Sequence, residues 1–534
     1  MNPVWINSFP FEHPRQQQID AIDHILNTFI DTSEQQFQFL EMGVGCGKSA
    51  VAATISHWSA INSVTTPEMQ AGAYILTTQK ILQNQYEKDF SPYAKSIKSA
   101  SAYTCNRLNT NCSEANKLFK ITSEAKQPID NACYDKCVYK VAKKDFINSQ
   151  IGITNFAFFM NDALYAKAIQ KRTLLVIDEC HNLESSLCSL IDIHLNGNTI
   201  KKLLNIELPK IKTLSQLQYW LQNTAVDALV IEISKIKSSL SNASKHENIN
   251  ESLLVSLTST LEQLLKLSVK IKRFLQTIDD SWVICDESTE DNVIIKIKPT
   301  DITQIAKDVL FKYSQRILMM SATICNPNVM AKTLGINKFN YYSMPSPFDP
   351  KNRPVHYMPI GKMSNAHFDT SMPILIEAIK EIILQHKNQK GIVHTGNYKI
   401  SKALSQIFTG KQFIFHDDSN RDLALEKHLL SPEPTVLFSP SMTDGVDLHD
   451  DLSRFQIICK LPYPNLMDPW VKKRCEQDAQ WYKWKTAAHI AQSVGRSIRH
   501  ENDWAITYIL DSCWDQFIKQ SSSLFNKSFL DALC

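Results

Sequence analysis

Short apolar runs alternate along this chain with segments that have the periodicity of helices. The runs FQFLEM at 37–42 and LLVI at 174–177 have the length and continuity of strands buried on both faces. The segment SAVAATISHWSAI, at 49–61, reads as a helix. Further strand-like runs lie at 390–396, 435–440, 454–462 and 504–511. Because buried strands that alternate with helices are typical of parallel sheets, the pattern predicts an α/β fold.

The central stretch, about 186–280, has a different pattern. It contains few glycines, and its leucines and isoleucines recur at helical spacing. The segments 213–240 and 252–276 both carry apolar residues at positions i, i+3, i+4 and i+7, and the polar sequence SNASKHENINES separates them. We therefore expect a helical domain inserted into the α/β fold.

Composition narrows the class of protein only a little. The chain has 534 residues, of which 43% are hydrophobic and 21% charged, and its net charge is +3. This is enough chain for several domains, and the charge neither demands nor excludes a nucleic-acid partner. No apolar run approaches the length of a membrane span, and the N-terminus lacks the pattern of a signal peptide. We expect a cytoplasmic or otherwise intracellular protein that does not bind membranes.

The sequence EMGVGCGKSA, at 41–50, concentrates glycine in a glycine-poor chain. Three of the 13 glycines lie in it, Gly43, Gly45 and Gly47. A strand, a glycine turn and a helix are the context of a loop that binds phosphate through backbone N–H groups. Lys48 would then reach the β and γ phosphates, and Ser49 would hold Mg²⁺. Met42 occupies the first glycine position of the usual pattern, a departure common in helicase loops. A simple glycine-rich helix cap would not explain the GKS triplet.

A second motif, the acidic sequence DECH, lies within RTLLVIDECHNLES at 172–185. Asp178 and Glu179 directly follow the apolar run, where the carboxyl end of a parallel strand would meet bound phosphates. Asp178 would hold Mg²⁺ through water, and Glu179 would orient and deprotonate the attacking water. His181 is close enough in sequence to sense the γ-phosphate. A solvated acidic turn would not explain the buried strand before it.

A basic segment, AAHIAQSVGRSIRH at 487–500, supplies candidate arginine fingers. Gln492, Arg496 and Arg499 recur at spacings of four and three, which predicts that they share one helix face. Two arginines there could neutralise charge on a transferring phosphoryl group. Alone, the segment is equally consistent with a basic surface helix. The phosphate loop and the DECH motif favour the catalytic interpretation.

Taken in order, these motifs resemble those of superfamily 2 helicases, specifically the iron–sulfur XPD/DinG family. HPRQQQIDAI (13–22) resembles the family's glutamine motif, which makes Gln16 the candidate to read adenine. ILMMSATICNP (317–327) resembles motif III, with Ser321 and Thr323 as coupling residues. SMTDGVDLHD (441–450) resembles motif V, which adds Gly445 and Asp447 to the expected nucleotide site. Residues 73–85 resemble motif Ia, and residues 391–400 resemble motif IV. Residues 346–350 resemble a stretch that the family carries just after motif III.

The resemblance implies two RecA-like domains with parallel sheets and ATP between them, plus an inserted iron–sulfur domain and an inserted helical arch. The phosphate loop and DECH would come from the first domain, and Arg496 and Arg499 from the second. The implied division is as follows: first RecA-like domain 1–95, 151–185 and 281–340; iron–sulfur domain 96–150; helical arch 186–280; second RecA-like domain 341–534.

Four cysteines lie between motif Ia and DECH. Cys105, Cys112, Cys133 and Cys137 are separated by six, twenty and three residues. Four thiolates can hold a [4Fe–4S] cluster or a structural Zn²⁺ ion, and the spacing alone does not decide. Two observations favour the cluster: there are no paired CxxC knuckles, and the family carries its iron–sulfur domain at this place. The family's helix and strand after the last cysteine are matched here by 138–156.

The resemblance implies an ATP-dependent DNA helicase that acts as a monomer on single-stranded and forked DNA and moves 5′→3′. Basic and aromatic residues are candidates for the DNA channel: Lys140, Lys143, Lys144, Trp470, Lys472, Lys473, Arg474, Trp481 and Trp484. Three alternatives remain open: a DNA-dependent translocase without unwinding, a nucleic-acid clamp switched by ATP, and a DEAH-type RNA helicase. The cysteine insertion argues against the RNA helicase, and the intact catalytic set argues against the clamp.

Overall fold

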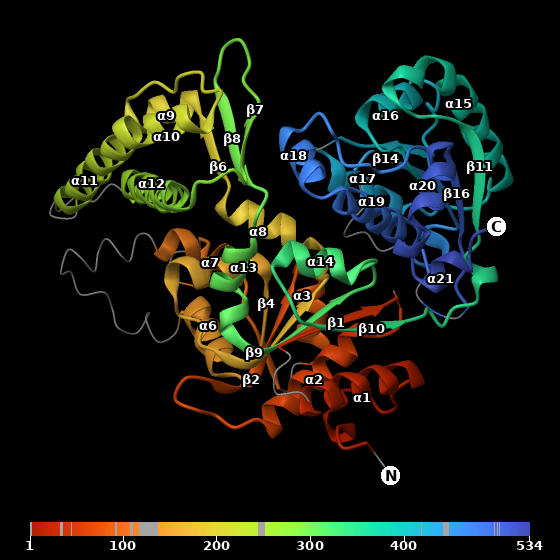
Figure 1. Cartoon of the computed structure of the whole chain (residues 1–534), viewed down its shortest axis with the longest axis horizontal. Coiled ribbons are helices and arrows are strands. Elements are labelled where there is room, and N and C mark those ends of the chain that lie inside the picture. Colours follow the sequence, from red (N-terminus) through yellow and green to blue (C-terminus); the bar gives the residue numbers. More distant parts are fainter. Residues whose placement is uncertain are drawn as a thin grey trace.

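The structure is a computed structural model. It describes residues 3–31, 36–43, 45–78, 80–90, 93–106, 110–116, 137–243, 251–417, 419–441, 448–495, 497–498, 500 and 502–534. Two parallel sheets and one smaller antiparallel sheet organise this part of the chain. In Figure 1 the first parallel sheet lies in the lower half, the second at the upper right, and the antiparallel sheet with its helices at the upper left.

The first domain is built on a seven-stranded sheet with the order β10-β1-β9-β5-β2-β4-β3. Every neighbouring pair in this sheet is parallel. Its strands are β1 (Phe37–Met42), β2 (Gln70–Thr77), β3 (Ala94–Ser96), β4 (Ile151–Asn155), β5 (Arg172–Asp178), β9 (Ser314–Ser321) and β10 (Asn340–Met344). The predicted strand at 174–177 is the centre of β5, which is buried along its whole length because helices cover both faces of the sheet.

Helices on the two faces of this sheet bury separate apolar cores. One core is formed with α1 (Gln16–Asp31), α2 (Lys48–Asn62) and α3 (Lys80–Asp89). The larger core lies on the other face and includes α6 (Val138–Asn148), α7 (Phe156–Asn161), α8 (Leu183–Ile191), α13 (Thr303–Val309) and α14 (Pro327–Leu334). The sheet is thus held between two layers of helices, which leaves the carboxyl ends of its strands free to carry the motifs.

The second domain is built on a six-stranded parallel sheet with the order β11-β16-β15-β12-β14-β13. Its strands are β11 (Val355–Gly361), β12 (Gly391–His394), β13 (Phe413–Phe415), β14 (Val436–Ser439), β15 (Phe455–Ile458) and β16 (Ile506–Asp511). Its helices are α15 (Phe368–Gln385), α16 (Tyr398–Ser405), α17 (Arg421–Leu430), α18 (Pro469–Gln477), α19 (Ala479–Val494), α20 (Cys513–Ser521) and α21 (Lys527–Leu530). The four C-terminal strand predictions are confirmed, and with them the α/β fold with parallel sheets.

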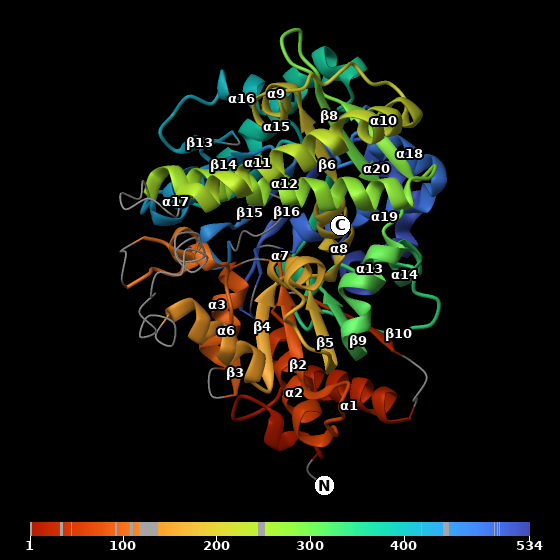
Figure 2. The same ribbon diagram turned by 90° about the vertical axis from the view of Figure 1, so that its left-hand side faces the viewer.

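A helical subdomain is inserted after α8. It contains the antiparallel strands β6 (Ile193–Asn196), β7 (Trp282–Asp286) and β8 (Ile294–Pro299), and the helices α9 (Gly197–Leu204), α10 (Leu214–Trp220), α11 (Val226–Ala243) and α12 (Glu251–Thr277). The two predicted helical segments are confirmed: α11 and α12 bury residues at helical spacing, such as Leu229 and Ile236 on α11 and Leu264 and Ile271 on α12. Figure 2 shows these two helices side by side above the first domain.

The observed sheets place two segments differently from the predicted division of the chain. The strands β7 and β8, predicted to return to the first domain, pair instead with β6 in the helical subdomain. Strand β10, which lies almost wholly in the range predicted for the second domain, pairs with β1 in the first. Both differences have one cause: apolar spacing predicts that a strand forms, but not which distant strand it pairs with.

The connection between the two large domains, residues 345–354, is held by the C-terminal helix α21. The amide of Ser346 donates to the hydroxyl of Ser528 at 2.6 Å, and the guanidinium of Arg353 donates to the carbonyl of Ser528 at 2.6 Å. Strand β11 follows at Val355, whose amide bonds to the carbonyl of Ala532 at 2.8 Å. The connection is therefore fastened at both of its ends. Among the described residues, no helix combines the length and apolarity needed to cross a membrane.

Candidate nucleotide site at the domain interface

The phosphate loop lies between β1 and α2, as predicted. Gly45 and Gly47 have φ values of 78° and 82°, in the left-handed region that favours glycine. A Cβ added at Gly47 would also meet the side-chain amide nitrogen of Gln18, so that side chain would have to move away from the loop. The Lys48 ammonium donates to the carbonyl of Met42 at 3.2 Å and so lies across the loop. This conformation and the start of α2 at Lys48 are suited to holding phosphate.

The glutamine beside the loop is Gln18 rather than Gln16. Gln18 is buried; its side-chain amide donates to the carbonyl of Gly47 at 3.4 Å, and its oxygen accepts from the amide of Arg15 at 2.9 Å. Gln16 instead donates to Asp20 on the exposed side of α1. The run QQQ at 16–18 offered one signal for this choice, because Gln18 precedes the buried Ile22 and Ile25 by four and seven residues and shares their helix face.

Asp178 lies at the carboxyl end of β5 and is almost completely buried. Burial and the adjacent Glu179 carboxylate raise its pKa to about 6, although Lys48 and a hydrogen bond from Tyr86 act in the opposite direction. A carboxylate in this setting is costly to ionise without a nearby cation. The site therefore fits the magnesium ligand predicted here.

Tyr86 on α3 is a site residue that the sequence analysis missed. Its hydroxyl donates to a carboxylate oxygen of Asp178 at 3.1 Å and is also hydrogen-bonded to the side chain of Ser49. Burial, together with Asp178, raises the pKa of Tyr86 well above its ordinary value, so it stays a neutral donor. The two predicted magnesium ligands are thus joined by one phenol. It directly follows the segment 73–85 that resembles motif Ia, which had no residue-level assignment.

Glu179 turns away from Asp178 toward the strand that carries the SAT sequence. Its φ of 53° is in the left-handed region, which costs a non-glycine residue energy and is often found at functional sites. Its carboxylate lies 3.4 Å from the hydroxyl of Ser321 and 3.4 Å from Nδ1 of His181. Ser321 also lies 2.8 Å from His181 Nδ1 and accepts from the amide of Thr323 at 3.0 Å. The DECH and SAT segments therefore form one hydrogen-bonded group.

His181 connects this group to the second domain. Its Nε2 lies 2.5 Å from the side-chain nitrogen of Gln492 on α19. The structure thus brings together Asp178, Glu179, His181, Ser321 and Gln492, which lie far apart along the chain. Other predicted site residues lie outside the described residues: Gly445, Asp447, Arg496 and Arg499.

Gln492 lies on helix α19, whereas Arg496 and Arg499, which were predicted to share one helix face with it, lie outside the described residues. Helix α19 ends at Val494, and the described residues that follow it, Gly495, Ser497 and Ile498, are not helical. Glycine at 495 favours this end because it adds conformational freedom where the helix stops.

Three of the four predicted metal-binding thiols lie together. Cys105 and Cys112 are buried, and burial, followed by the nearby Cys137 and Cys105, raises the pKa of Cys112. The amide of Cys112 donates to the carbonyl of Tyr103 at 2.8 Å, which folds this segment back on itself. Cys137 immediately precedes α6, as predicted, and β4 follows that helix. Cys133 lies outside the described residues.

The proposed aromatic DNA contacts are corrected by the structure. Trp481 and Trp484 are 2% and 1% exposed and pack in the core of the first domain, so neither offers a face to a passing strand. Arg474 is also buried, in an ion pair with Glu184. The sequence could not show this burial, because it does not reveal that the first domain covers the face of α19 that carries Trp481 and Trp484. Lys144 and Lys472 are exposed, whereas Lys143 pairs with Asp162.

A pocket lies at the carboxyl ends of β12, β14 and β15 in the second domain. Its lining includes His394, Gly396, Ser441 and Lys460. Ligands of open parallel sheets bind at these strand ends. The pocket is mostly apolar in its lining, and Lys460 supplies one cationic group to it.

Comparison with known proteins places these features in a family. A family model described as "Helicase C-terminal domain" matches residues 379–529, and one described as "Type III restriction enzyme, res subunit" matches residues 12–263. The chain is 23% identical over 456 residues to the ATP-dependent DNA helicase CHL1 of Scheffersomyces stipitis, which covers 66% of this chain and 53% of that protein. It is 19% identical over 453 residues to the ATP-dependent DNA helicase YoaA of Haemophilus influenzae, which covers 74% of this chain and 69% of that one. The chain thus spans about half the length of the first relative.

Solved structures show the same fold. An XPD helicase structure covers 96% of this chain and 99% of its own with a TM-score of 0.63 and 14% identity. The structure of S. tokodaii Xpd4 covers 95% of this chain and 97% of its own, with a TM-score of 0.56 and 14% identity. The matched regions, the relatives and the shared fold together support a superfamily 2 helicase as the class of this chain. Within that class, the relatives and solved structures that it resembles support the XPD/DinG type.

Proposed function

We propose that this protein is an ATP-dependent DNA helicase that hydrolyses Mg–ATP between its two parallel sheets. One observation carries the proposal: the DECH segment contacts both the SAT segment of its own domain and Gln492 of the other domain. A change at the γ-phosphate would therefore be felt by both domains. The named relatives, CHL1 and YoaA, are ATP-dependent DNA helicases, which supports DNA as the substrate.

Each part of the site has a proposed role in hydrolysis. Glu179 orients the attacking water and takes its proton, because it lies just beyond the end of β5 and its carboxylate is directed to Ser321 and His181. Gln492 and His181 report the γ-phosphate to the second domain, while Ser321 and Thr323 carry the signal within the first. A bound Mg²⁺ would neutralise phosphate charge. The residues proposed to bind ATP, Mg²⁺ or the transition state are Gln18 in place of Gln16, Gly43, Gly45, Gly47, Lys48, Ser49, Asp178, Gly445, Asp447, Arg496 and Arg499.

We propose that Cys105, Cys112, Cys133 and Cys137 hold a [4Fe–4S] cluster. The three described thiols support this assignment, because they converge beside α6, where Cys105 and Cys112 are buried. The cluster would act as a structural crosslink for a segment that has little apolar core of its own. Zinc is the other metal that four thiolates could bind.

The proposed DNA path runs across the carboxyl ends of both parallel sheets, under the helical subdomain acting as an arch. The pocket lined by His394 and Lys460 offers polar and cationic groups to a phosphate backbone at one point of this path. The exposed Lys144 and Lys472 remain candidate contacts. Movement 5′→3′ on single-stranded DNA, with the cysteine segment at the fork, and action as a monomer complete the proposal.

Strand displacement tests the proposed function. The protein is purified without oxygen and given ATP with duplexes that carry either a 5′ or a 3′ single-stranded tail. We expect unwinding of the 5′-tailed duplex only, and loss of unwinding and ATP turnover in Lys48→Ala and Glu179→Gln. ATP turnover that DNA stimulates without unwinding would instead indicate a translocase or clamp. Full activity in either variant would contradict the site.

A further inference from the structure

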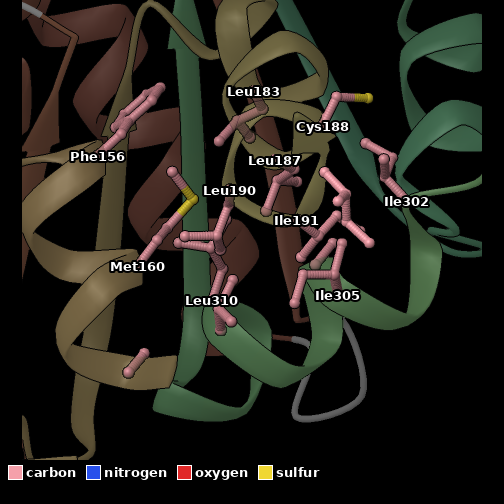
Figure 3. Close-up of a cluster of buried hydrophobic side chains, with 14 of the residues drawn as sticks. Phe156, Met160, Leu183, Leu187, Cys188, Leu190, Ile191, Ile302, Ile305 and Leu310 are labelled. Atoms are coloured by element: carbon pink, nitrogen blue, oxygen red, sulfur yellow. The ribbon is translucent and has the colours of Figure 1, made fainter. Parts of the chain in front are cut away.

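Helix α8, which follows the DECH motif directly, is fixed inside the first domain. Figure 3 shows its apolar side chains, Leu183, Leu187, Leu190 and Ile191, packed among residues of α7 and of the segment around α13. Those neighbours are Phe156, Met160, Ile302, Ile305 and Leu310. Because this face is fully buried, α8 moves with the first domain. Glu184 is the charged residue in its first turn.

Three donors from the second domain converge on the Glu184 carboxylate. Trp481 donates its indole N–H at 2.8 Å, the Lys485 ammonium lies at 3.0 Å, and Nε of Arg474 lies at 3.2 Å. Burial alone would raise the pKa of Glu184, but Lys485 and Arg474 outweigh it and lower the pKa, so the carboxylate is ionised. Arg474 also donates to the hydroxyl of Thr333 at 2.9 Å. This is a fully paired buried ion network, which is unfavourable to open because separation leaves its charges unpaired.

The same end of α19 shares the apolar core of the first domain. Val471 of α18 and Trp481 and Trp484 of α19 are buried with the side chains that surround α8 and α14. The indole of Trp484 donates to the carbonyl of Ile324, at the turn after the SAT segment, at 2.7 Å. The indole of Trp470 donates to the carbonyl of Pro299 at the end of β8, at 2.8 Å. The first half of α19 thus packs as part of the first domain, although the chain assigns it to the second.

The second half of α19 makes a different kind of contact. It packs against the second sheet through Ala487 and Ile490, and reaches the first domain through the side chain of Gln492. Among the described residues, this half of the helix makes one side-chain hydrogen bond to the first domain, from the partly buried Gln492 to the buried His181. One such bond opens more readily than a buried ion network. One helix therefore carries a strong contact at one end and a weak contact at the other.

We infer that α18 and the first half of α19 form a fixed joint between the two domains. The Glu184 network stays intact through the ATP cycle, and the domains move about it by opening and closing the Gln492 end. Glu184, Arg474 and Lys485 are then positioning residues: they touch no substrate, but they fix the axis about which Gln492 approaches the nucleotide. The inference rests on the proposed function, because it assigns a geometry to that function's domain movement.

Hydrogen exchange of the unmodified protein tests the joint. Amide protection is measured by mass spectrometry without nucleotide, with Mg–ADP, and with Mg–ADP plus beryllium fluoride. We expect protection in peptides from 469–486 to stay the same in all three states, and protection in peptides from 488–500 to change by about tenfold. Equal changes in both regions would overturn the joint and leave the proposed function standing. No change in either region would overturn both, because each requires nucleotide-driven movement.

Two variants give a second, independent readout. In Glu184→Gln, Arg474 and Lys485 lose their charge partner; we expect the KM for ATP to stay within about twofold, while base pairs opened per ATP hydrolysed fall about tenfold. Lys332→Met is the matched control, because it removes a different ion pair across the same interface, the pair of Lys332 with Asp478. The side chain of Lys332 is 69% exposed. We expect this control to behave as the unchanged protein. A parallel fall of turnover and unwinding in Glu184→Gln would mean that Glu184 is only structural, and would overturn the inference.

Discussion

Tyr86 joins the two proposed magnesium ligands at the scale of single residues. Its hydroxyl donates to Asp178 and is hydrogen-bonded to Ser49, so it holds the phosphate-loop side and the DECH side of the site in register. A neutral phenol suits this place because a second anion beside Asp178 would repel it. The role is one of placement, since the phenol stabilises the ionised form of the carboxylate that must meet the cation.

The first prediction concerns the removal of the Tyr86 hydroxyl. In Tyr86→Phe, Asp178 loses a hydrogen bond that lowers its pKa, and a bond to a charged acceptor is worth about 1.5–3 kcal/mol. We expect the Mg²⁺ concentration for half-maximal ATP turnover to rise about tenfold, as measured by titration at fixed ATP. Tyr93→Phe serves as the control, because Tyr93 stacks on His57 away from Asp178. An unchanged Mg²⁺ requirement in Tyr86→Phe would remove Tyr86 from the site.

The raised pKa of Asp178 also predicts that the stability of the folded chain depends on pH. Its pKa in the fold is raised to about 6, so ionisation destabilises the folded chain above that pH, and the penalty disappears as pH falls toward the ordinary value of 3.8. We expect Asp178→Asn, measured without Mg²⁺, to unfold at a higher temperature than the unchanged protein at pH 8. The gap should close between pH 6 and pH 4, while the variant loses ATP turnover. A gap that stays constant with pH would show that Asp178 is not the cause.

At the scale of elements, strand β1 is tied to the turn that follows β9. Glu41 near the end of β1 is buried; it accepts from the amide of Cys325 at 3.0 Å and from the hydroxyl of Tyr341. Cys325 has a φ of 59°, so this turn holds a non-glycine residue in the left-handed region. The neighbouring carbonyl of Ile324 accepts from Trp484. The strand that ends in the phosphate loop thus supports the turn that the second domain contacts.

Glu41→Gln is therefore expected to weaken the link between elements. The amide retains one acceptor but turns a donor toward Cys325 or Tyr341, and an unsatisfied buried group costs about 1–3 kcal/mol. We expect a lower midpoint of thermal unfolding and a severalfold loss of stimulation of ATP turnover by single-stranded DNA, with basal turnover kept. Glu12→Gln is the control, because it makes the same chemical change at a carboxylate that is exposed. Unchanged stimulation in Glu41→Gln would contradict this link.

Elements could be predicted from the sequence where their signals are local. The apolar runs located β1, β5 and the strands of the second sheet, because a strand buried on both faces needs a continuous run. Contacts between distant segments could not be predicted. Glu184 and Trp481 lie in separate domains, and neither position carries a mark of its partner. Tyr86 was missed for the same reason, because its role depends on which side of a helix meets the loop. Gln18 was missed although its spacing from Ile22 and Ile25 marks the buried face of α1.

At the scale of the whole molecule, three bodies meet around the DECH segment. The first domain supplies the segment, the second contacts it through α19, and the helical subdomain contacts α18 through Pro299. In Figure 1, α8 lies at the junction of these bodies. The described cysteines lie beside α6, which contacts β3 and β4 at one edge of the first sheet, whereas Asp178 and Ser321 end the inner strands β5 and β9. The proposed metal site and the catalytic groups are therefore attached to different strands of this sheet.

The last prediction follows from the separate positions of the proposed metal site and the catalytic groups. Cys112→Ser should lose iron and duplex unwinding, but keep a measurable part of its ATP turnover, since the described cysteines pack against Tyr103 and Tyr139 rather than against the catalytic groups. Metal analysis and absorbance in the visible range measure the first effect, and strand displacement the second. Cys188→Ser is the matched control, because Cys188 is an equally buried thiol on α8. Full iron content in Cys112→Ser would contradict the assignment of this ligand.

The fastening of residues 345–354 by α21 has a consequence for the energetics of closure. A free tether would let the second domain explore a large volume, and closing on ATP would then have to overcome that entropy. Because Ser528 anchors the tether near its start and its end, few of its residues can vary in conformation. The effective concentration of one domain at the surface of the other is correspondingly high. Much of the entropic cost of assembling the composite active site is thus met during folding, before any nucleotide arrives.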